Sequence, residues 1–301
     1  MVPADARVVL SADLRAVRSS PFERFLRDTP IQATGDAAGC DRDAFDRADH
    51  LALWIPGDTP DQFGVAATGA FASEALLACA RTTIAKRGGT PAVTIEGEFS
   101  VVGDDTLGAD AARIAIGPAG LVLIGRPSSR TRMAAVRAGR TPSAADQGEH
   151  ARMRAELGTH DVVFTVVVDA SVKAAARRYV DQELPMLDGV RGLGVAVDAA
   201  AMAKIEVAFW CEPGDACVRL QAEIEARRSA MARSLPLRAV GVAGLAEATT
   251  VLLQGSVLRV SVEVPADQVV ALIDRLSRLG ASGDAMKMPA DEVLPAPGGS
   301  K

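Results

Sequence analysis

Aromatic side chains are scarce in this chain. Phe, Trp and Tyr together make up 4% of its 301 residues, whereas hydrophobic residues as a whole make up 49%. Much of the apolar content is Ala and Val, which predicts a core of many small contacts with few aromatic anchors. Surfaces that bind nucleic acids or sugars usually stack their ligands on aromatic rings, so this shortage argues against both kinds of ligand.

Basic residues are too few and too scattered to form a surface for a polyanion. The chain carries 33 basic and 38 acidic residues, a net charge of -5, and its sequence pI is near 5.4. A nucleic acid would have to overcome general electrostatic repulsion, and we therefore expect no nucleic-acid partner.

Long apolar runs are also absent. No run approaches the roughly 20 residues that are needed to cross a bilayer, so we expect no transmembrane segment. Residues 1–5 lead directly into a predicted strand, without the basic and hydrophobic regions of a secretion signal. Either the protein is cytoplasmic, or a signal has been removed ahead of Met1. The second alternative is compatible with a lipid anchor upstream of this sequence.

Sequence signatures of catalysis and of metal binding are missing. The three histidines, His50, His150 and His160, have no metal-ligand spacing, and there is no HExxH motif, paired CxxC, GxSxG elbow or Walker lysine. Residues 189–194, GVRGLG, have their glycines in the wrong order for a dinucleotide loop and predict a flexible turn. We assign no catalytic, cofactor-binding or metal residue, and we expect no cofactor. A site assembled only in three dimensions remains open.

Four cysteines offer two candidate disulfides. Cys211 and Cys217 enclose the residues EPGDA, a tight turn that can bring the two sulfurs together. A bridge over so short a loop would contribute roughly 2 kcal/mol to stability. Cys40 and Cys79 form a weaker second candidate pair. Disulfides persist in oxidising compartments and would favour export, whereas four free thiols would remove that argument.

Alternating and continuous apolar stretches, separated by Gly and Pro turns, predict twelve strands and several helices. The predicted strands span residues 8–12, 50–55, 63–71, 92–96, 99–102, 112–116, 121–125, 162–168, 192–197, 203–210, 250–254 and 256–264. The main predicted helices span residues 20–26, 73–88, 127–138, 150–157, 171–183, 215–234 and 266–279.

The order of these elements predicts an α+β fold of two similar units, each a mostly antiparallel sheet with helices packed on one face. The first unit covers residues 1–140, a linker and short helix cover 141–157, the second unit covers 158–280, and residues 281–301 form a disordered tail. In the strand at 203–210, Ile, Val and Phe alternate with Glu and Ala, which predicts one covered face and one wetter face.

Two features are candidates for recognition. Trp54 and Trp210 end strands, where a tryptophan closes a core or contacts a partner. A basic helix carries Arg126, Arg130, Arg132, Arg137 and Arg140, which form either a solvated face or a surface for acidic groups or lipid headgroups. In the helix at 215–234, we expect Val218, Ile224 and Met231 to point inward.

Four segments of this chain resemble a group of uncharacterised bacterial cell-envelope proteins, many of them predicted lipoproteins. The resemblance is carried by PADARVVLSADLRAVRSSPF, FGVAATGAFASEALLACA, GLVLIGRPSSRTRMAAV and GLGVAVDAAAMAKIEVAFWCEPGDACVRLQAEI, and it covers most of residues 3–279. It implies an exported location and a duplicated α+β fold. It implies no biochemical activity.

These observations favour a non-enzymatic structural or binding protein of the bacterial cell envelope, periplasmic or associated with the outer envelope, with an unknown protein or peptide partner. One alternative is a hydrolase whose site is assembled only by the fold. Another is a module that binds a small ligand or peptide in a groove between the units. A cytoplasmic location is the alternative to export.

Overall fold

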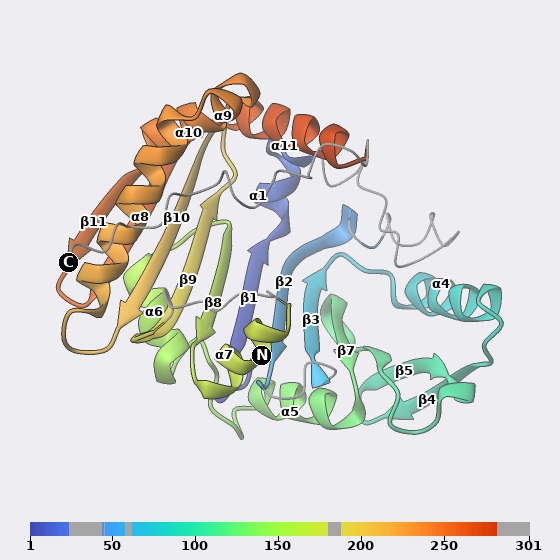
Figure 1. Ribbon diagram of the computed structural model, residues 1–301. Coiled ribbons are helices and arrows are strands. Elements are labelled where there is room, and N and C mark those ends of the chain that lie inside the picture. The colour runs from blue at the N-terminus through green and yellow to red at the C-terminus, as the bar shows by residue number, and fades with distance from the viewer. Residues whose placement is uncertain (24–43, 45, 58–61, 180–187, 282–301) are drawn as a thin grey trace.

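The strands predicted from the sequence assemble into one antiparallel sheet. The computed structural model describes residues 1–23, 44, 46–57, 62–179 and 188–281 (Figure 1). All twelve stretches that the sequence predicts as strands are strands, and each pairs antiparallel with its neighbours. In sheet order they are β11 (Thr250–Gln254), β12 (Val257–Pro265), β10 (Met202–Cys211), β9 (Val190–Asp198), β8 (Val162–Val167), β1 (Val8–Asp13), β2 (Ala48–Ile55), β3 (Gly64–Gly69), β7 (Leu121–Gly125), β6 (Arg113–Ile116), β5 (Phe99–Asp104) and β4 (Pro91–Glu96).

The expectation of two separate sheets is wrong. Strand β1 pairs with β8 from Val8 opposite Val166 to Ala12 opposite Val162, and this ladder joins the two halves into a single twelve-stranded sheet. Both strands are continuous apolar runs, and an unpaired edge of either would leave a row of open N–H and C=O groups. Pairing the two strands removes both edges.

The residues expected to link two units are tied down. Ala4 N donates to Pro142 O, Ala144 N donates to Val2 O, and Ala144 is buried. This stretch therefore packs against the N-terminal segment beside the sheet. The predicted disordered tail spans residues 281–301, and all of it except Ala281 lies outside the described residues.

Helices lie on both faces of the sheet, which corrects the expectation of helices on one face. The described helices are α1 (Leu14–Arg18), α4 (Ser73–Lys86), α5 (Pro127–Arg137), α6 (Gly148–Leu157), α7 (Ala170–Tyr179), α8 (Ala216–Arg233), α9 (Leu235–Val240), α10 (Val242–Ala248) and α11 (Ala266–Ala281).

The alternation of side chains along a strand shows which helices lie on the same face of the sheet. In β10, Trp210 packs with Met153 and Leu157 of α6, whereas its neighbour Phe209 packs with the cluster that contains Leu220 of α8. Helices α5 and α6 therefore cover one face, which we call the α5–α6 face, and α4 and α8 lie on the other, which we call the α4–α8 face. In Figure 1, α8 and α10 lie at the left end of the row of strands, near β10 and β11, and α4 lies at the right end, near β5. Helix α11 crosses the top of the view.

The short helix α1 is not among the main helices predicted from the sequence. Asp13 ends β1 and caps α1, because its Oδ1 accepts hydrogen bonds from Arg15 N and Ala16 N at 3.0 and 3.2 Å. Residues 24–26 of the helix predicted at residues 20–26 lie outside the described residues.

The glycine-rich stretch at 189–194 is not a flexible turn. Gly192 and Gly194 lie inside β9, on the face that α6 covers. A Cβ at Gly194 would lie 2.8 Å from Leu157 Cδ1 and 2.9 Å from Trp210 Cη2, and one at Gly192 would lie 2.9 Å from Met153 Sδ. These glycines make room for the large side chains of α6 and β10.

We predict that Gly194→Ala lowers the free energy of unfolding by about 1–3 kcal/mol, because the added methyl group overpacks a rigid contact. Urea unfolding followed by circular dichroism measures the change. Gly244→Ala is the matched control, since no atom lies within 4 Å of a Cβ there and the residue is in α10. This control should be neutral or stabilising. Equal midpoints for the two variants would contradict the packing argument.

Candidate functional site

A continuous row of half-buried apolar side chains crosses the α4–α8 face. Directly paired residues on ten strands make up this row: Ile114, Ile124, Val65, Leu53, Leu10, Phe164, Val195, Val207, Val260 and Val251. Every one of them is partly accessible to solvent. We call this set the apolar row.

Much of the opposite face of the same strands is covered. Val9, Trp54, Thr165 and Ala208, which alternate with members of the apolar row, are 3%, 1%, 0% and 0% exposed. The sequence predicts the reverse for β10, where Glu206 and Ala208 were expected on the wetter side. Glu206 is in fact buried and pairs with Arg259. The apolar side chains of the central strands therefore face the less covered side.

A cavity of about 410 Å³ lies at one end of the apolar row, between α4 and the sheet. Its floor includes Leu51, Ala67, Ile114, Val122 and Ile124, and its wall on α4 includes Leu76, Cys79, Ala80, Thr83 and Ile84. Nearly all of this lining is apolar. The volume falls within the roughly 300–1,000 Å³ of typical small-molecule sites.

Small side chains create this cavity. Helix α4 spans fourteen residues and none of them is buried, although it lies beside β4, β5 and β6. Ala80 and Thr83 on the helix, and Ala48 and Ala67 on the sheet, are too short to meet across the gap. The sequence predicts this helix correctly, but helical periodicity gives no measure of how closely a helix approaches its sheet.

His150 is a buried structural residue. It is 1% exposed, its Nε2 donates to Ala6 O at 2.8 Å, and its Nδ1 lies 2.8 Å from Thr165 Oγ1. Because a carbonyl can only accept, the proton sits on Nε2 and the Thr165 hydroxyl donates to Nδ1. Burial lowers the pKa of this ring, against the effect of the Ala6 bond, and nearby Arg154 and Arg7 lower it further. His150 thus ties α6 to the segment before β1 and to β8.

The other two histidines lie near a second, polar cavity. Both ring nitrogens of His160 face oxygen acceptors, since Nδ1 lies 2.9 Å from Asp198 Oδ1 and Nε2 lies 2.8 Å from Leu157 O. His50 is half exposed, and its Nε2 lies 3.3 Å from Arg15 Nη2. Within the described part of the chain, no three His, Cys, Asp or Glu side chains gather in a way that could hold a metal ion.

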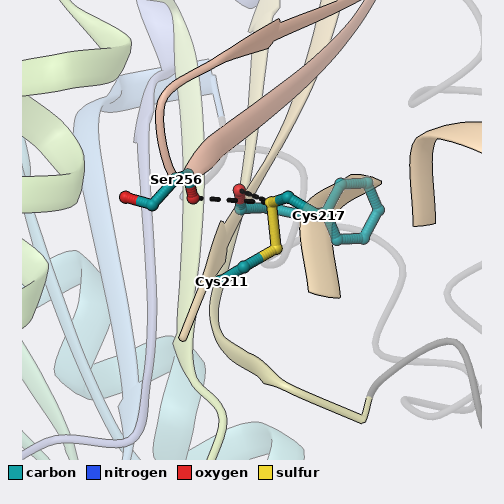
Figure 2. Close-up of a disulfide and its surroundings, with 4 residues drawn as sticks. Cys211, Cys217 and Ser256 are labelled. Carbon is teal, nitrogen blue, oxygen red and sulfur yellow. Dashed lines mark hydrogen bonds between the residues drawn. A yellow bond between two sulfur atoms is a disulfide. The ribbon is translucent and has the colours of Figure 1, made fainter. Parts of the chain in front are cut away.

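The Cys211–Cys217 disulfide is present and joins the end of β10 to the first turn of α8 (Figure 2). The two Cα atoms are 5.6 Å apart, and both residues are buried. Cys217 Sγ also lies 3.4 Å from Ser256 O, next to the β11–β12 turn. Cys79 lines the apolar cavity. Its predicted partner, Cys40, lies outside the described residues, so that pair stays a prediction.

Both tryptophans lie in the core. Trp54 packs above Gly64 and beneath the Arg132 guanidinium, which is 4.8 Å from the ring centroid. Trp210 is 3% exposed, and its Nε1 donates to Glu156 Oε2 at 2.7 Å. Neither ring presents a surface to a partner in this conformation.

The arginines of the basic helix α5 pair with groups elsewhere in the protein and do not simply form a solvated face. Arg130 is buried and donates to Gly125 O and to both carboxylate oxygens of Glu96, each at 3.0 Å. Arg132 pairs with Asp5, and Arg137 pairs with Glu98 at 2.6 Å. Arg126 also has a partner, and Arg140 is exposed.

In α8, Val218 and Met231 are 54% and 38% exposed, which corrects the expectation that they point inward.

Comparison with solved structures finds a likeness in fold. The structure described as crystal form I of TP0453 aligns with 92% of this chain and 98% of its own, with a TM-score of 0.50 and 10% sequence identity. At this identity the likeness concerns the fold alone. No protein-family model and no curated protein matches the sequence. Among the described helices, none combines the length and the apolar character needed to cross a membrane.

We predict that His150 makes stability fall as the pH is lowered below about 6.5. The unfolded ring takes up a proton near pH 6.5, whereas the folded ring does so only at lower pH. Its contribution is therefore fully present above pH 6.5 and is lost as the pH falls toward the folded pKa, by at most about 1.4 kcal/mol per pH unit.

Urea unfolding of the wild type and of His150→Gln between pH 7.5 and 5 measures this slope. The slope should shrink in His150→Gln and persist in His50→Gln, which alters an exposed ring. If His150→Gln does not fold, NMR titration of the wild-type ring gives the answer directly. A ring that titrates at or above pH 6.5 in the folded chain would contradict the argument.

Proposed function

We propose that this protein is a non-enzymatic, exported binding protein of the bacterial cell envelope that holds an apolar chain, such as the acyl tail of an amphiphile, in the cavity between α4 and the sheet. The observation that carries the proposal is the cavity itself, with about 410 Å³ of space and an almost wholly apolar lining. Thr83 and Arg87 provide polar atoms on α4 and just beyond it, where a headgroup would lie.

The apolar row supports the same conclusion. Isolated apolar side chains are normal on protein surfaces, but a contiguous exposed apolar surface usually marks a binding site. Here the half-buried residues form an unbroken line that leads from Ile114 and Ile124, inside the cavity, toward Leu53 and Leu10. A chain longer than the cavity would therefore continue over apolar side chains.

Export is supported by the Cys211–Cys217 disulfide, because such bonds persist in oxidising compartments. The resemblance of the sequence to bacterial envelope proteins points the same way. We place the protein in the periplasm or at the outer envelope on these two grounds, with a cytoplasmic location as the alternative.

An enzymatic function remains the rival proposal, and the described histidines give it little support. Among the described residues, Thr165 is the one hydroxyl bonded to a histidine ring, yet both it and His150 are at most 1% exposed, so a substrate has no access to them. The nitrogens of His160 are both engaged. A hydrolase would have to use other groups or a different conformation.

We further propose that the two halves of the sheet descend from a duplicated unit. Outward from β1 the strands run β2, β3, β7, β6, and outward from β8 they run β9, β10, β12, β11. Helix α4 follows β3 as α8 follows β10, and the β4–β5 hairpin is the additional element of the first half. Superposition of the two halves tests this origin: a fit no better than that between unrelated antiparallel α+β units would contradict it.

We predict that Ala80→Phe weakens binding of decanoate and 1-decanol at least about tenfold, because the ring fills the cavity that the chain would occupy. Titration calorimetry below the aggregation concentration of each ligand measures the affinity. The matched control is Ala78→Phe, the same change on the exposed side of the same helix, which should leave binding unchanged.

Circular dichroism checks that both variants fold, and Ala80→Leu serves if Ala80→Phe does not. Absence of binding to the wild type, or equal affinities for Ala80→Phe and Ala78→Phe, would overturn the proposed site. Preference for decanoate over 1-decanol would indicate that the polar groups near Arg87 contribute to recognition.

A further inference from the structure

A second cavity, of about 340 Å³, lies on the α5–α6 face of the sheet, opposite the apolar one. Its lining mixes charged and small residues, including Ser11 and Asp13 of β1, His50 of β2, Arg154 of α6 and Asp161 just before β8. The charged groups of this lining take no part in the proposed binding of an apolar chain. The charges on its walls identify a different kind of ligand.

Arg154 provides a positive charge without a neutralising partner. Its Nη1 donates to Ser11 Oγ at 2.6 Å, and within the described part of the chain no carboxylate lies within 4.0 Å of it. The side chain is partly buried, and burial lowers the pKa of the guanidinium. A partly buried cation bonded only to a neutral hydroxyl is stabilised by any anion that enters the cavity.

Two carboxylates in the same lining have unused acceptor atoms. Asp161 Oδ2 accepts from Ala199 N at 2.7 Å, and no described donor bonds to its Oδ1. Asp13 uses Oδ1 to cap α1, where Arg15 Nε also lies 3.9 Å from it, and its Oδ2 lies 3.9 Å from His50 Nδ1. Burial alone would raise the pKa of Asp13, but hydrogen bonds from the backbone of Ala16 and Arg15 outweigh this effect and lower the pKa, so the carboxylate stays ionised.

The cavity therefore presents a guanidinium and two carboxylates that are more than 4.0 Å from it. A simple anion would meet the repulsion of Asp13 and Asp161, and a simple cation would meet that of Arg154. A molecule with both charges, held a few ångströms apart, satisfies all three groups. The small side chains of Ala52 and Ala66 leave space between them.

We propose that this cavity binds a small zwitterion, a free α-amino acid. The ligand carboxylate accepts hydrogen bonds from the Arg154 guanidinium, and the ligand ammonium donates to Asp13 and Asp161. His50, whose side chain is 53% exposed, lies where the cavity opens to solvent. The side chain of the amino acid leaves the cavity on that side, so selectivity among amino acids is modest.

The test is calorimetric titration of the full chain with each of the twenty standard amino acids, with acetate and methylammonium as ligands that carry one charge each. We expect at least one amino acid to bind, and acetate and methylammonium to bind at least tenfold more weakly. Arg154→Gln should weaken amino-acid binding at least about tenfold, because it leaves the ligand carboxylate unpaired. Asp161→Asn should also weaken it, because it removes one of the two carboxylates that pair with the ligand ammonium.

Arg152→Gln is the matched control, since Arg152 lies on the same helix, is exposed and pairs with Glu149. It should bind as the wild type does. If Arg154→Gln does not fold, Arg154→Lys replaces it, and chemical-shift changes at Ala52 and Ala66 of the wild type locate the ligand. Three results would each overturn the proposal: no binding of any amino acid, binding that Arg154→Gln leaves unchanged, or equally tight binding of acetate.

Discussion

The antiparallel ladder between β1 and β8 holds the two halves of the chain in one sheet. Around it, the segment before β1 and the one after β8 are tied together by an ion pair of 3.1 Å between Arg7 and Asp169. From α6, His150 bonds to Ala6 in the segment before β1 and to Thr165 within β8. His150 and Thr165 are buried and hydrogen-bonded, so they hold α6 in place against β8 and the segment before β1.

Outward from this ladder the two faces diverge in how well they are covered. On the α5–α6 face, glycines in β9 let α6 approach so closely that Met153, Leu157 and Trp210 are almost inaccessible. On the α4–α8 face, the helices contact mainly the outer strands, and the apolar row stays partly accessible. A protein that required only stability would gain by covering that row, since each fully buried aliphatic side chain contributes roughly 1.5–3 kcal/mol.

Local signals in the sequence predict the elements well, because each strand is an apolar stretch between turn residues. The turn chemistry of residues 212–216 also suffices to pair Cys211 with Cys217. The pairing of β1 with β8 is different, because it joins residues about 154 positions apart and leaves no local trace. The order of strands and helices in the sequence predicts two similar units, and that similarity equally fits two separate sheets.

The faces are harder to predict than the elements for a related reason. Alternation in β10 separates Phe209 from Trp210, but it does not say which of the two sides the helices will seal. Glu206 suggests a wet side, yet Arg259 on the neighbouring strand β12 neutralises it and allows its burial.

The partly buried position of Arg154 is not predicted by the sequence either, since one arginine in a short helix is usually solvated. Its partner Ser11 comes from β1, 143 positions away, and the cavity exists only once the sheet is complete.

The lining of the cavity beneath α4 argues that it is a site rather than a packing defect. The cavity is partly open to solvent, so its apolar walls face water, and a ligand that covers them gains roughly 25 cal/mol for each Å² of apolar area removed from water. Water is poorly held there, because ordered water needs two to four polar partners and this lining offers mainly aliphatic carbon. Larger residues at Ala67 and Ala80 would close the gap by ordinary packing. A chain that keeps alanine at both places retains an apolar space that only an apolar ligand fills at a gain in free energy.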